Sequence, residues 1–331
     1  MNDVIIVGGG PGGLLFGHLF QQNDVKYLIL EKESIGNSFR KMRPNMVLLS
    51  PAIPGTDWTS LTLKQPIWAI DGVSKPYPTR DDFVCYLERF AVDNALDVKE
   101  HTPVESVQRD GGSFKVVCGD GAYHSKYVVL ATGFYAKPRY PGIPGIEGNP
   151  YVTHYANFFG CMAYQGKKVL VVGGGNSAAE IAIELSGVCD VTLKTRGPLR
   201  FFSETDDLGD IRGFSESVLK ELIRFNIIKH VMDSDIRGFE GDTVIFESGK
   251  SKRFDKIILA TGFLPDFPPL KDMEIKCGNN GVPLITKGGE SVSAEGVFFG
   301  GSLAMFHSRC RFIHGFRNEA EKVAWKIFDR L

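Results

Sequence analysis

Three glycines near the N-terminus have the spacing of a dinucleotide-binding turn. The segment IIVGGGPGG places Gly8, Gly10 and Gly13 in the pattern G-x-G-x-x-G, directly after an apolar run at residues 4–7. The first glycine permits a tight turn, the second lets the backbone approach a pyrophosphate, and the third lets a helix pack closely on a strand. Glu31 ends the next apolar run, at the distance along the chain where a carboxylate accepts hydrogen bonds from a ribose diol. These residues predict a site for a dinucleotide with a free ribose diol.

A second glycine cluster, VLVVGGGNSA, repeats this arrangement in the middle of the chain. Its three positions hold Gly173, Gly175 and Ala178. Alanine is an accepted variant of the packing position. The position that corresponds to the acid of the first cluster holds Arg196, which can pair with a 2′-phosphate, with Lys194 or Arg200 as further basic groups. The second site therefore favours NADPH over NADH; the alternative is that Arg196 is a solvated surface residue.

Each cluster requires a buried strand before it and a helix after it. We expect the first helix at about residues 12–22 and the second to run through Leu185. The pentapeptide LATGF occurs at residues 130–134 and again at 259–263, each time at the end of an apolar strand. Glycine-containing pairs at 111–112, 120–121, 241–242 and 248–249 predict hairpin turns between clusters and pentapeptides. The pattern indicates an α/β fold with two Rossmann-like dinucleotide-binding domains, each of three layers.

Two other helices are predicted from their ends and their apolar faces. Thr79 and Asp82 resemble a capping box. The terminal helix is expected to begin near Ile313. The residues predicted to pack into the core are Phe83, Leu87 and Phe90 of the first helix and Val323, Trp325, Ile327 and Phe328 of the second.

Composition restricts the class of protein. A chain of 331 residues, 43% hydrophobic and 23% charged, is typical of one large or two ordinary globular domains. Its 38 basic and 39 acidic residues nearly balance, which argues against a nucleic-acid partner. A first strand at residue 3 or 4 leaves no room for a signal peptide, and no apolar run of about 18 residues suggests a membrane span, so we predict a cytoplasmic protein with no membrane partner. The six cysteines lack C-x-x-C or metal-ligand spacing and are predicted to be buried reduced thiols, with no metal site.

Taken together, both glycine clusters and both ATG segments resemble a two-dinucleotide-binding-domain flavoprotein, most similar to the small flavin-containing monooxygenase-like oxidoreductases that use FAD and NADPH. The ending GVFFGGSL…FIHGFRNEAEKVAWKI resembles the same family. The resemblance implies that an NADPH domain is inserted into a discontinuous FAD domain. Segments 136–166 and 263–296, rich in proline and glycine, are the expected crossings. We therefore predict an FAD domain at 1–145 and 286–331, and an NADPH domain at 146–285.

The resemblance also assigns cofactor-binding residues. The segment EKESIGNSFR resembles a loop that runs toward the isoalloxazine, LLSP resembles a segment that lines the ring, and Val104 resembles a backbone contact to adenine. Gly301 and Ser302 stand where many relatives have Gly-Asp facing the ribityl chain. The FAD set is Gly8, Gly10, Pro11, Gly12, Gly13, Glu31, Lys32, Ser38, Phe39, Ser50, Val104, Ala131, Thr132, Gly133, Gly301 and Ser302. The NADPH set is Gly173, Gly175, Asn176, Ser177, Ala178, Thr195, Arg196, Arg200, Thr261 and Gly262.

A polar cluster in MFHSRCRFIHGF supplies the candidate catalytic residues. His307 and Arg309 are expected beside the flavin, where they would hold an anionic substrate or tune the flavin. Arg311 and His314 belong to the same cluster, and Cys310 is a candidate redox thiol without a nearby resolving partner. The alternative is that these groups pair with carboxylates or cap the last helix. The aromatic side chains expected either to wall a pocket or to fill the core are Trp58, Trp68 and Tyr77.

The resemblance implies hydride transfer from NADPH to FAD, and three outcomes for the electrons stay open. Monooxygenation of a small sulfur or nitrogen nucleophile with O₂ is the first interpretation. The family linker motif F-x-G-x-x-x-H-x-x-x-(Y/F) is half present, with His154 and Phe158 in place but Gly148 and Pro150 at its leading positions. The second is a reductase that serves a disulfide, quinone or protein acceptor; bacillithiol disulfide reductases resemble the chain but carry a cysteine where Gly12 stands. The third is a redox-sensing flavoprotein without turnover. The oligomeric state is open, with a homodimer as the candidate.

Overall fold

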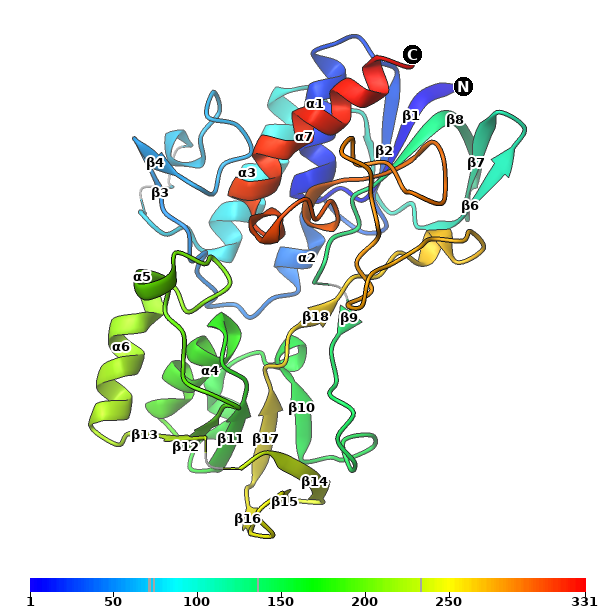
Figure 1. Ribbon diagram of the computed structural model, residues 1–331. Coiled ribbons are helices and arrows are strands. Elements are labelled where there is room, and N and C mark those ends of the chain that lie inside the picture. Colours follow the sequence, from blue (N-terminus) through cyan, green and yellow to red (C-terminus); the bar gives the residue numbers. More distant parts are fainter. Residues whose placement is uncertain (71–72, 74, 136, 233) are drawn as a thin grey trace. The chain divides into compact units, whose positions relative to one another are not determined.

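The computed structural model describes residues 1–70, 73, 75–135, 137–232 and 234–331, so the first crossing is described except for Ala136. The chain divides into two compact units (Figure 1). The first unit comprises Met1–Met42, Met46–Lys137 and Leu264–Leu331, and the second comprises Arg43–Asn45 and Pro138–Phe263. At the two main crossings, β9 (Lys137–Pro138) pairs with β18 (Phe263–Leu264). Along the chain, the second unit is thus inserted into the first.

The first unit is built on a mostly parallel sheet in the order β5-β2-β1-β8-β7-β6, with β19 pairing the end of β8. Strands β1, β2 and β8 run parallel, whereas β6, β7 and β8 form an antiparallel meander with turns at the predicted glycine pairs. The strands are β1 (Asn2–Val7), β2 (Tyr27–Leu30), β3 (Ala52–Ile53), β4 (Thr56–Asp57), β5 (Val98–Lys99), β6 (Val104–Asp110), β7 (Ser113–Cys118), β8 (Gly121–Leu130) and β19 (Val297–Phe299). The α-helices are α1 (Pro11–Gln21), α2 (Asn37–Arg40), α3 (Arg80–Asp93) and α7 (Ile313–Phe328).

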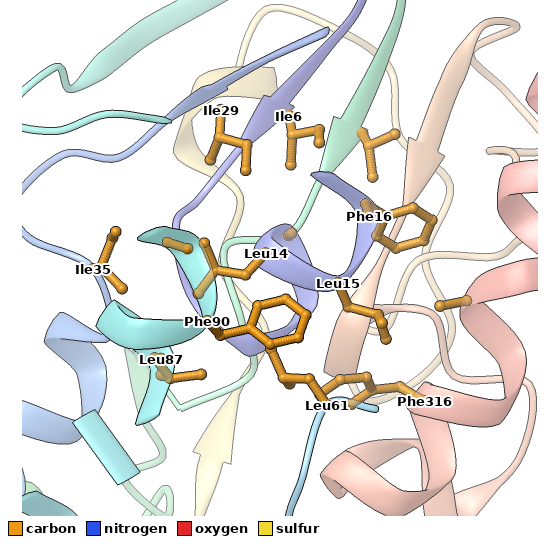
Figure 2. Close-up of a cluster of buried hydrophobic side chains, with 14 of the residues drawn as sticks. Ile6, Leu14, Leu15, Phe16, Ile29, Ile35, Leu61, Leu87, Phe90 and Phe316 are labelled. Carbon is orange, nitrogen blue, oxygen red and sulfur yellow. The ribbon is translucent and has the colours of Figure 1, made fainter. Parts of the chain in front are cut away.

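Alternate residues of β1 face two separate cores of the first unit. Ile6 packs with α1, α3 and α7 on one face (Figure 2), and Ile5 packs on the other with the meander and β19. The predicted capping box of α3 is confirmed, because Thr79 accepts from the Asp82 amide while the Asp82 carboxylate accepts from the Thr79 amide. The resulting three layers bury residues 4–7 of β1 on both faces, as this apolar run predicts.

The second unit repeats the parallel arrangement on a smaller scale. Its five-stranded sheet has the order β10-β17-β11-β12-β13, and a three-stranded antiparallel sheet, β14-β15-β16, covers the face opposite α4 and α6. The strands are β10 (Val152–His154), β11 (Lys168–Val172), β12 (Asp190–Lys194), β13 (Ile228–Val231), β14 (Ile236–Glu240), β15 (Thr243–Phe246), β16 (Ser251–Arg253) and β17 (Lys256–Leu259). The α-helices are α4 (Asn176–Ser186), α5 (Phe202–Thr205) and α6 (Gly213–Arg224).

The borders of the units differ from the predicted 145/146 and 285/286. Residues 138–145 belong to the second unit, where Gly145 lies so close to Phe239 that a Cβ would overlap the Phe239 carbonyl oxygen. Residues 264–285 belong to the first unit, where Leu270 is buried in the core below β19. Proline and glycine mark where the chain leaves regular structure, but the unit that a crossing joins is decided by where its few apolar side chains are buried.

Two predictions about burial were wrong in part. Trp325 is 58% exposed, although Val323 and Ile327 of the same helix are buried. Cys85 and Cys277 are exposed rather than buried. When a helix has apolar residues at several spacings, its sequence alone does not show which of them face the core. The apolar face of α7 that packs on α1 includes Val323 and Ile327 but not Trp325. None of the helices in the described part of the chain has the length and apolar character that a membrane span requires.

Candidate functional site: two dinucleotide cradles and a C-terminal polar cluster

The first glycine cluster joins β1 to α1 and is packed against two other segments of its unit. Gly8 has φ +112°, and a Cβ there would lie 2.6 Å from the Ala131 carbonyl oxygen. Gly13 lies on the Gly8 carbonyl oxygen, which a Cβ would overlap, and a Cβ on Gly12 would lie 2.7 Å from Gly301 Cα. The ATG segment excludes a side chain at Gly8, the turn after β19 excludes one at Gly12, and the backbone of the cluster itself excludes one at Gly13.

The N-terminus of α1 has the properties of an anion site. Gly10 is the N-cap, Pro11 occupies the first turn, and among the described residues no side chain caps the helix and no acid stands in its first turn. A Cβ on Gly10 would meet no described atom within 4 Å, so its backbone borders open space. Unpaired amides and the positive end of the helix dipole face this space, which fits a pyrophosphate.

Glu31 follows β2 and its carboxylate is held by the loop that it borders. The residue is 7% exposed; Oε2 accepts a hydrogen bond from Gly9 N at 2.6 Å and Oε1 accepts one from Glu33 N at 3.0 Å. A carboxylate has about four acceptor sites, so each oxygen can accept another hydrogen bond. The arrangement fixes the carboxylate beside the glycine turn and leaves acceptor capacity for a ribose diol.

The other residues of the predicted FAD set fall into two groups. Ala131, Thr132, Gly133 and Gly301, with Ser302 next in the chain, lie in the segments that follow β8 and β19, the two strands that run beside each other. Thr132 is tied to its neighbourhood because Oγ1 donates to Asp266 O at 3.1 Å. The remaining members lie between β2 and β7. Lys32 and Ser38 are exposed and Ser50 is half-buried. Phe39 packs edge-on against Phe83, and Val104 is the first residue of β6.

A buried polar network fixes the turn at residues 57–60. The Asp57 carboxylate accepts from the amides of Thr59 and Ser60, at 3.0 and 2.9 Å, and from the Ser60 hydroxyl. The Ser60 Oγ in turn accepts from Ile67 N at 2.8 Å. Arg317 on α7 donates to the carbonyl oxygens of Ser60 and Asp57 at 2.9 and 3.0 Å. Sequence reasoning missed this network, because a pattern in the chain does not reveal a side chain that binds carbonyl groups more than 250 residues away.

The turn supports the segment predicted to line the flavin. Thr59 Oγ1 donates to the Ser50 carbonyl oxygen at 3.0 Å. Trp58, between the two anchored residues, places its ring 5.3 Å from the ring of His314 at the start of α7. Arg317 therefore positions both Ser50 and Trp58 through the turn.

The second glycine cluster has the same local geometry as the first. Gly173 has φ +146°, and a Cβ would overlap the carbonyl oxygen of Ala260 in the second ATG segment. Gly175 is the N-cap of α4; no side chain in the described chain caps this helix, and no described atom lies within 4 Å of where its Cβ would stand. Ala178 is 1% exposed, so its methyl group fills the packing position that glycine holds in the first cluster. This cradle also fits a pyrophosphate.

The basic residues at the end of β12 and after it differ in whether their charged groups are available to a 2′-phosphate. Lys194 is 2% exposed and donates to the Thr195 carbonyl oxygen at 2.6 Å, so its ammonium is engaged inside the unit. Thr195 Oγ1 lies 2.8 Å from His230 Nε2, and burial lowers the pKa of His230, so that imidazole is held neutral. Arg196 and Arg200 are exposed, and Arg200 pairs with Asp210 at 3.1 Å. The exposed guanidinium groups are the ones that fit a 2′-phosphate.

Asn176, the first residue of α4, forms hydrogen bonds to the loop that precedes α6 in the second unit. Its Nδ2 donates to Asp210 O at 2.9 Å, and its Oδ1 accepts from Arg212 N at 2.8 Å. The predicted site residue Ser177 follows it on the first turn of the helix, and Thr261 Oγ1 donates to Arg139 O at 2.6 Å. Asn176 thus holds the loop before α6 against the cradle.

Two buried side chains of the second unit, Arg43 and His154, make contacts that the sequence analysis did not predict. Arg43 is nearly buried and forms ion pairs with Glu180, at 2.6 Å, and with Glu184 on α4. His154 is fully buried: Nδ1 accepts from Ala156 N at 3.1 Å, so Nε2 is the protonated nitrogen and donates to Gly262 O at 3.0 Å. Burial lowers the pKa of His154, which fits this neutral role. The histidine of the half-present linker motif therefore supports the second ATG segment.

A family model described as pyridine nucleotide-disulphide oxidoreductase matches residues 5–301. The chain belongs to this family. The family brings FAD and a pyridine nucleotide, and both glycine cradles fit such dinucleotides, so the protein is an FAD- and NADPH-dependent oxidoreductase. Its chemistry depends on the two cofactors; among the described residues, no group of three or more His, Cys, Asp or Glu side chains could hold a metal ion.

Three proteins of similar length illustrate the range of the family. An uncharacterized CzcO-like oxidoreductase of Geobacillus kaustophilus is 28% identical over 353 residues, which cover 99% of this chain and 98% of the relative. A flavin-containing monooxygenase from Stenotrophomonas maltophilia superposes with a TM-score of 0.85 at 25% identity, covering 99% of this chain and 98% of its own. A bacillithiol disulfide reductase from Bacillus cereus superposes with a TM-score of 0.81 at 26% identity, covering 100% and 99%. The fold is thus shared by a flavin-containing monooxygenase and a bacillithiol disulfide reductase.

The C-terminal polar cluster lies in the first unit, between the turn after β19 and α7. His307 Nε2 is 3.5 Å from Glu319 Oε1, and the same imidazole is 3.6 to 3.7 Å from the Cys310 sulfur. Cys310 is fully buried, and burial raises the pKa of its thiol. Arg309 and Arg311 are exposed, and Arg311 covers the ring of Phe134. The structure therefore places both candidate catalytic residues at one cavity beside the start of α7, with Cys310 buried close to His307.

Proposed function

We propose that this oxidoreductase uses NADPH and O₂ to oxygenate a small sulfur or nitrogen nucleophile. Bound FAD, once reduced by NADPH, can deliver electrons either to O₂ or to a disulfide, and the family includes both outcomes. The choice between them depends on whether the protein supplies a thiol next to the first glycine cluster.

The main support for the monooxygenase is the close contact between Gly12 and Gly301. A Cβ at residue 12 would stand 2.7 Å from the Gly301 Cα, inside the limit for two carbon atoms in contact. A cysteine in the position expected of a disulfide reductase would therefore have to displace the backbone of the turn after β19. The chain does have a buried thiol near α7, that of Cys310. Burial raises the pKa of this thiol and so disfavours the thiolate that disulfide exchange requires.

The residues of the first unit support the proposed reaction by binding and orientation. The α1 amides would hold the pyrophosphate, and Glu31 would hold the ribose. The N-terminus of α7 would stabilise negative charge on the reduced flavin, since no described side chain caps it and its first turn holds no acid. Arg196 and Arg200 would select the 2′-phosphate of NADPH. Hydride transfer then needs little beyond the correct positioning of the two cofactors.

A disulfide reductase is the second candidate, because the Bacillus cereus enzyme matches along the whole chain. Both candidates are tested with the FAD-loaded protein and NADPH under ¹⁸O₂, with dimethyl sulfide as the nucleophile. We expect labelled dimethyl sulfoxide in proportion to the NADPH consumed. A parallel anaerobic reaction with cystine should yield no free thiol. If all electrons instead appear as hydrogen peroxide in the first reaction and as thiol in the second, the reductase replaces the monooxygenase. A chain that oxidises no NADPH in either reaction would be a sensor.

A further inference from the structure

A cavity of about 380 Å³ opens beside the start of α7 in the first unit. Its lining residues are His307, Ser308, Arg309, His314, Gly315, Asn318 and Glu319. They come from one continuous stretch of chain, a 3-10 helix at Ser308–Arg311 followed by the first two turns of α7. The volume is within the range of small-molecule sites, and the lining offers hydroxyl, amide, imidazole and guanidinium donors.

The charges around the cavity favour an anion. Arg309 is exposed, and within the described chain no carboxylate forms an ion pair with it. The lining has one acid, Glu319, and that carboxylate is paired with Lys322 Nζ at 2.7 Å and lies 3.5 Å from His307 Nε2. The hydrogen bond from Lys322 holds the pKa of Glu319 below its usual range, so Glu319 stays ionised within this pairing. The guanidinium of Arg309 is thus left without a counter-charge of its own.

Two features around the cavity add to this preference. The first is the positive end of α7, a helix of 16 residues that begins at Ile313 without an acid in its first turn; residues of its first two turns line the cavity, so the field proposed to act on the flavin also reaches the cavity. The second is the aromatic ring of His314, which lines the cavity and lies 5.3 Å from the ring of Trp58, measured between centroids. A cation, a dipole and an aromatic face together match an organic anion better than an inorganic one.

We propose that this cavity binds the carboxylate of a small organic acid, with Arg309 as the main anchor. A planar guanidinium can donate two parallel hydrogen bonds to a carboxylate, which an ammonium cannot do. The inference rests on the proposed function in one respect: the acid would be the substrate, so the oxygenated sulfur or nitrogen compound would carry a carboxylate.

The binding test uses the FAD-loaded protein without NADPH, so it requires no turnover. Benzoate, benzyl alcohol and inorganic sulfate are titrated in turn by isothermal calorimetry. We expect benzoate to bind, and benzyl alcohol and sulfate to bind at least tenfold more weakly. Arg309→Gln should weaken benzoate about three- to tenfold, the range for a partly exposed charge-assisted pair. The matched control is Arg311→Gln, which alters an exposed arginine two residues away that packs on Phe134 and does not line the cavity.

Several outcomes would overturn the proposal. These are equal affinity for benzoate and benzyl alcohol, tighter binding of sulfate than of benzoate, no benzoate binding in the millimolar range, or equal losses in both arginine variants. A kinetic arm separates this from the proposed function: Arg309→Gln should raise KM for (methylthio)acetate at least threefold more than it raises KM for dimethyl sulfide. If neither sulfide is oxygenated but benzoate binds as expected, the oxygenation fails and the anion site stands.

Discussion

Replacing Arg317 by methionine should release the turn at residues 57–60 while the rest of the first unit stays folded. The methionine keeps most of the apolar length of the side chain and removes the guanidinium that binds the carbonyl groups of Asp57 and Ser60. The turn would keep the hydrogen bonds to the Asp57 carboxylate but would no longer be tied to α7.

The magnitude follows from the two lost hydrogen bonds. Each has a charged donor and good length, 2.9 and 3.0 Å, and such bonds contribute about 1.5–3 kcal/mol. Against this, burial lowers the pKa of Arg317, which means that burying its charge costs free energy that methionine does not incur. The free energy of opening the turn should therefore fall by about 2–3 kcal/mol, less than the sum of the two bonds.

Hydrogen exchange measured by mass spectrometry reports this opening directly. Since about 1.4 kcal/mol is a factor of ten, peptides that cover residues 57–67 should exchange about 30 to 150 times faster in the variant. Peptides from β1 and β8 should exchange at the wild-type rate. The matched control is Arg89→Met, which removes an exposed arginine of α3 whose ion pair with Asp93 lies on the surface. Unchanged exchange at residues 57–67, or equal acceleration throughout the unit, would refute the positioning role of Arg317.

Three other substitutions test the second unit. Arg43→Met should destabilise it by about 3–5 kcal/mol at neutral pH. Burial raises the pKa of the Glu180 carboxyl, so without its partner the deficit should grow from pH 5 to pH 8 in chemical denaturation; a deficit that shrinks as pH rises contradicts this. Wild-type stability should fall as pH drops below about 6.5, because buried His154 has a lowered pKa, and His154→Gln should lessen that slope. Arg196→Ala should raise KM for NADPH much more than KM for NADH; equal increases would remove it from the phosphate site.

The sequence predicted the parts of the site that depend on local backbone geometry. The glycine turns, the capping box of α3 and the hairpin turns each follow from residue types within a few positions of one another. Contacts between distant residues left no such signal. Arg43 and Glu180 are 137 residues apart, and Arg317 reaches Asp57 across 260. A charged residue in a loop or on a helix has the same local pattern whether it faces solvent or a buried partner, so burial decides its role.

The domain borders show the same limit from another side. The Pro- and Gly-rich stretches were located from composition, yet residues 264–285 pack with the first unit because Leu270 and its neighbours complete the core below β19. Lys194 is a similar case. Its place at the end of β12 suggested a group for a phosphate, but its ammonium is turned inward onto the Thr195 carbonyl group.

The two cradles are nearly alike where they hold a pyrophosphate and differ where they meet a ribose. In both, the first glycine lies on the carbonyl group of the alanine in LATGF, so the repeated pentapeptide is the second wall of each turn. After the following strand, Glu31 binds the amides of its own loop and presents a carboxylate, whereas Arg196 is exposed and presents a cation. A carboxylate repels a 2′-phosphate and a guanidinium attracts it, so we expect the first cradle to disfavour NADPH and the second to favour it. The duplicated turn accounts for a pyrophosphate cradle in each unit, and we expect the one charged residue that differs between the copies to decide which dinucleotide each cradle holds.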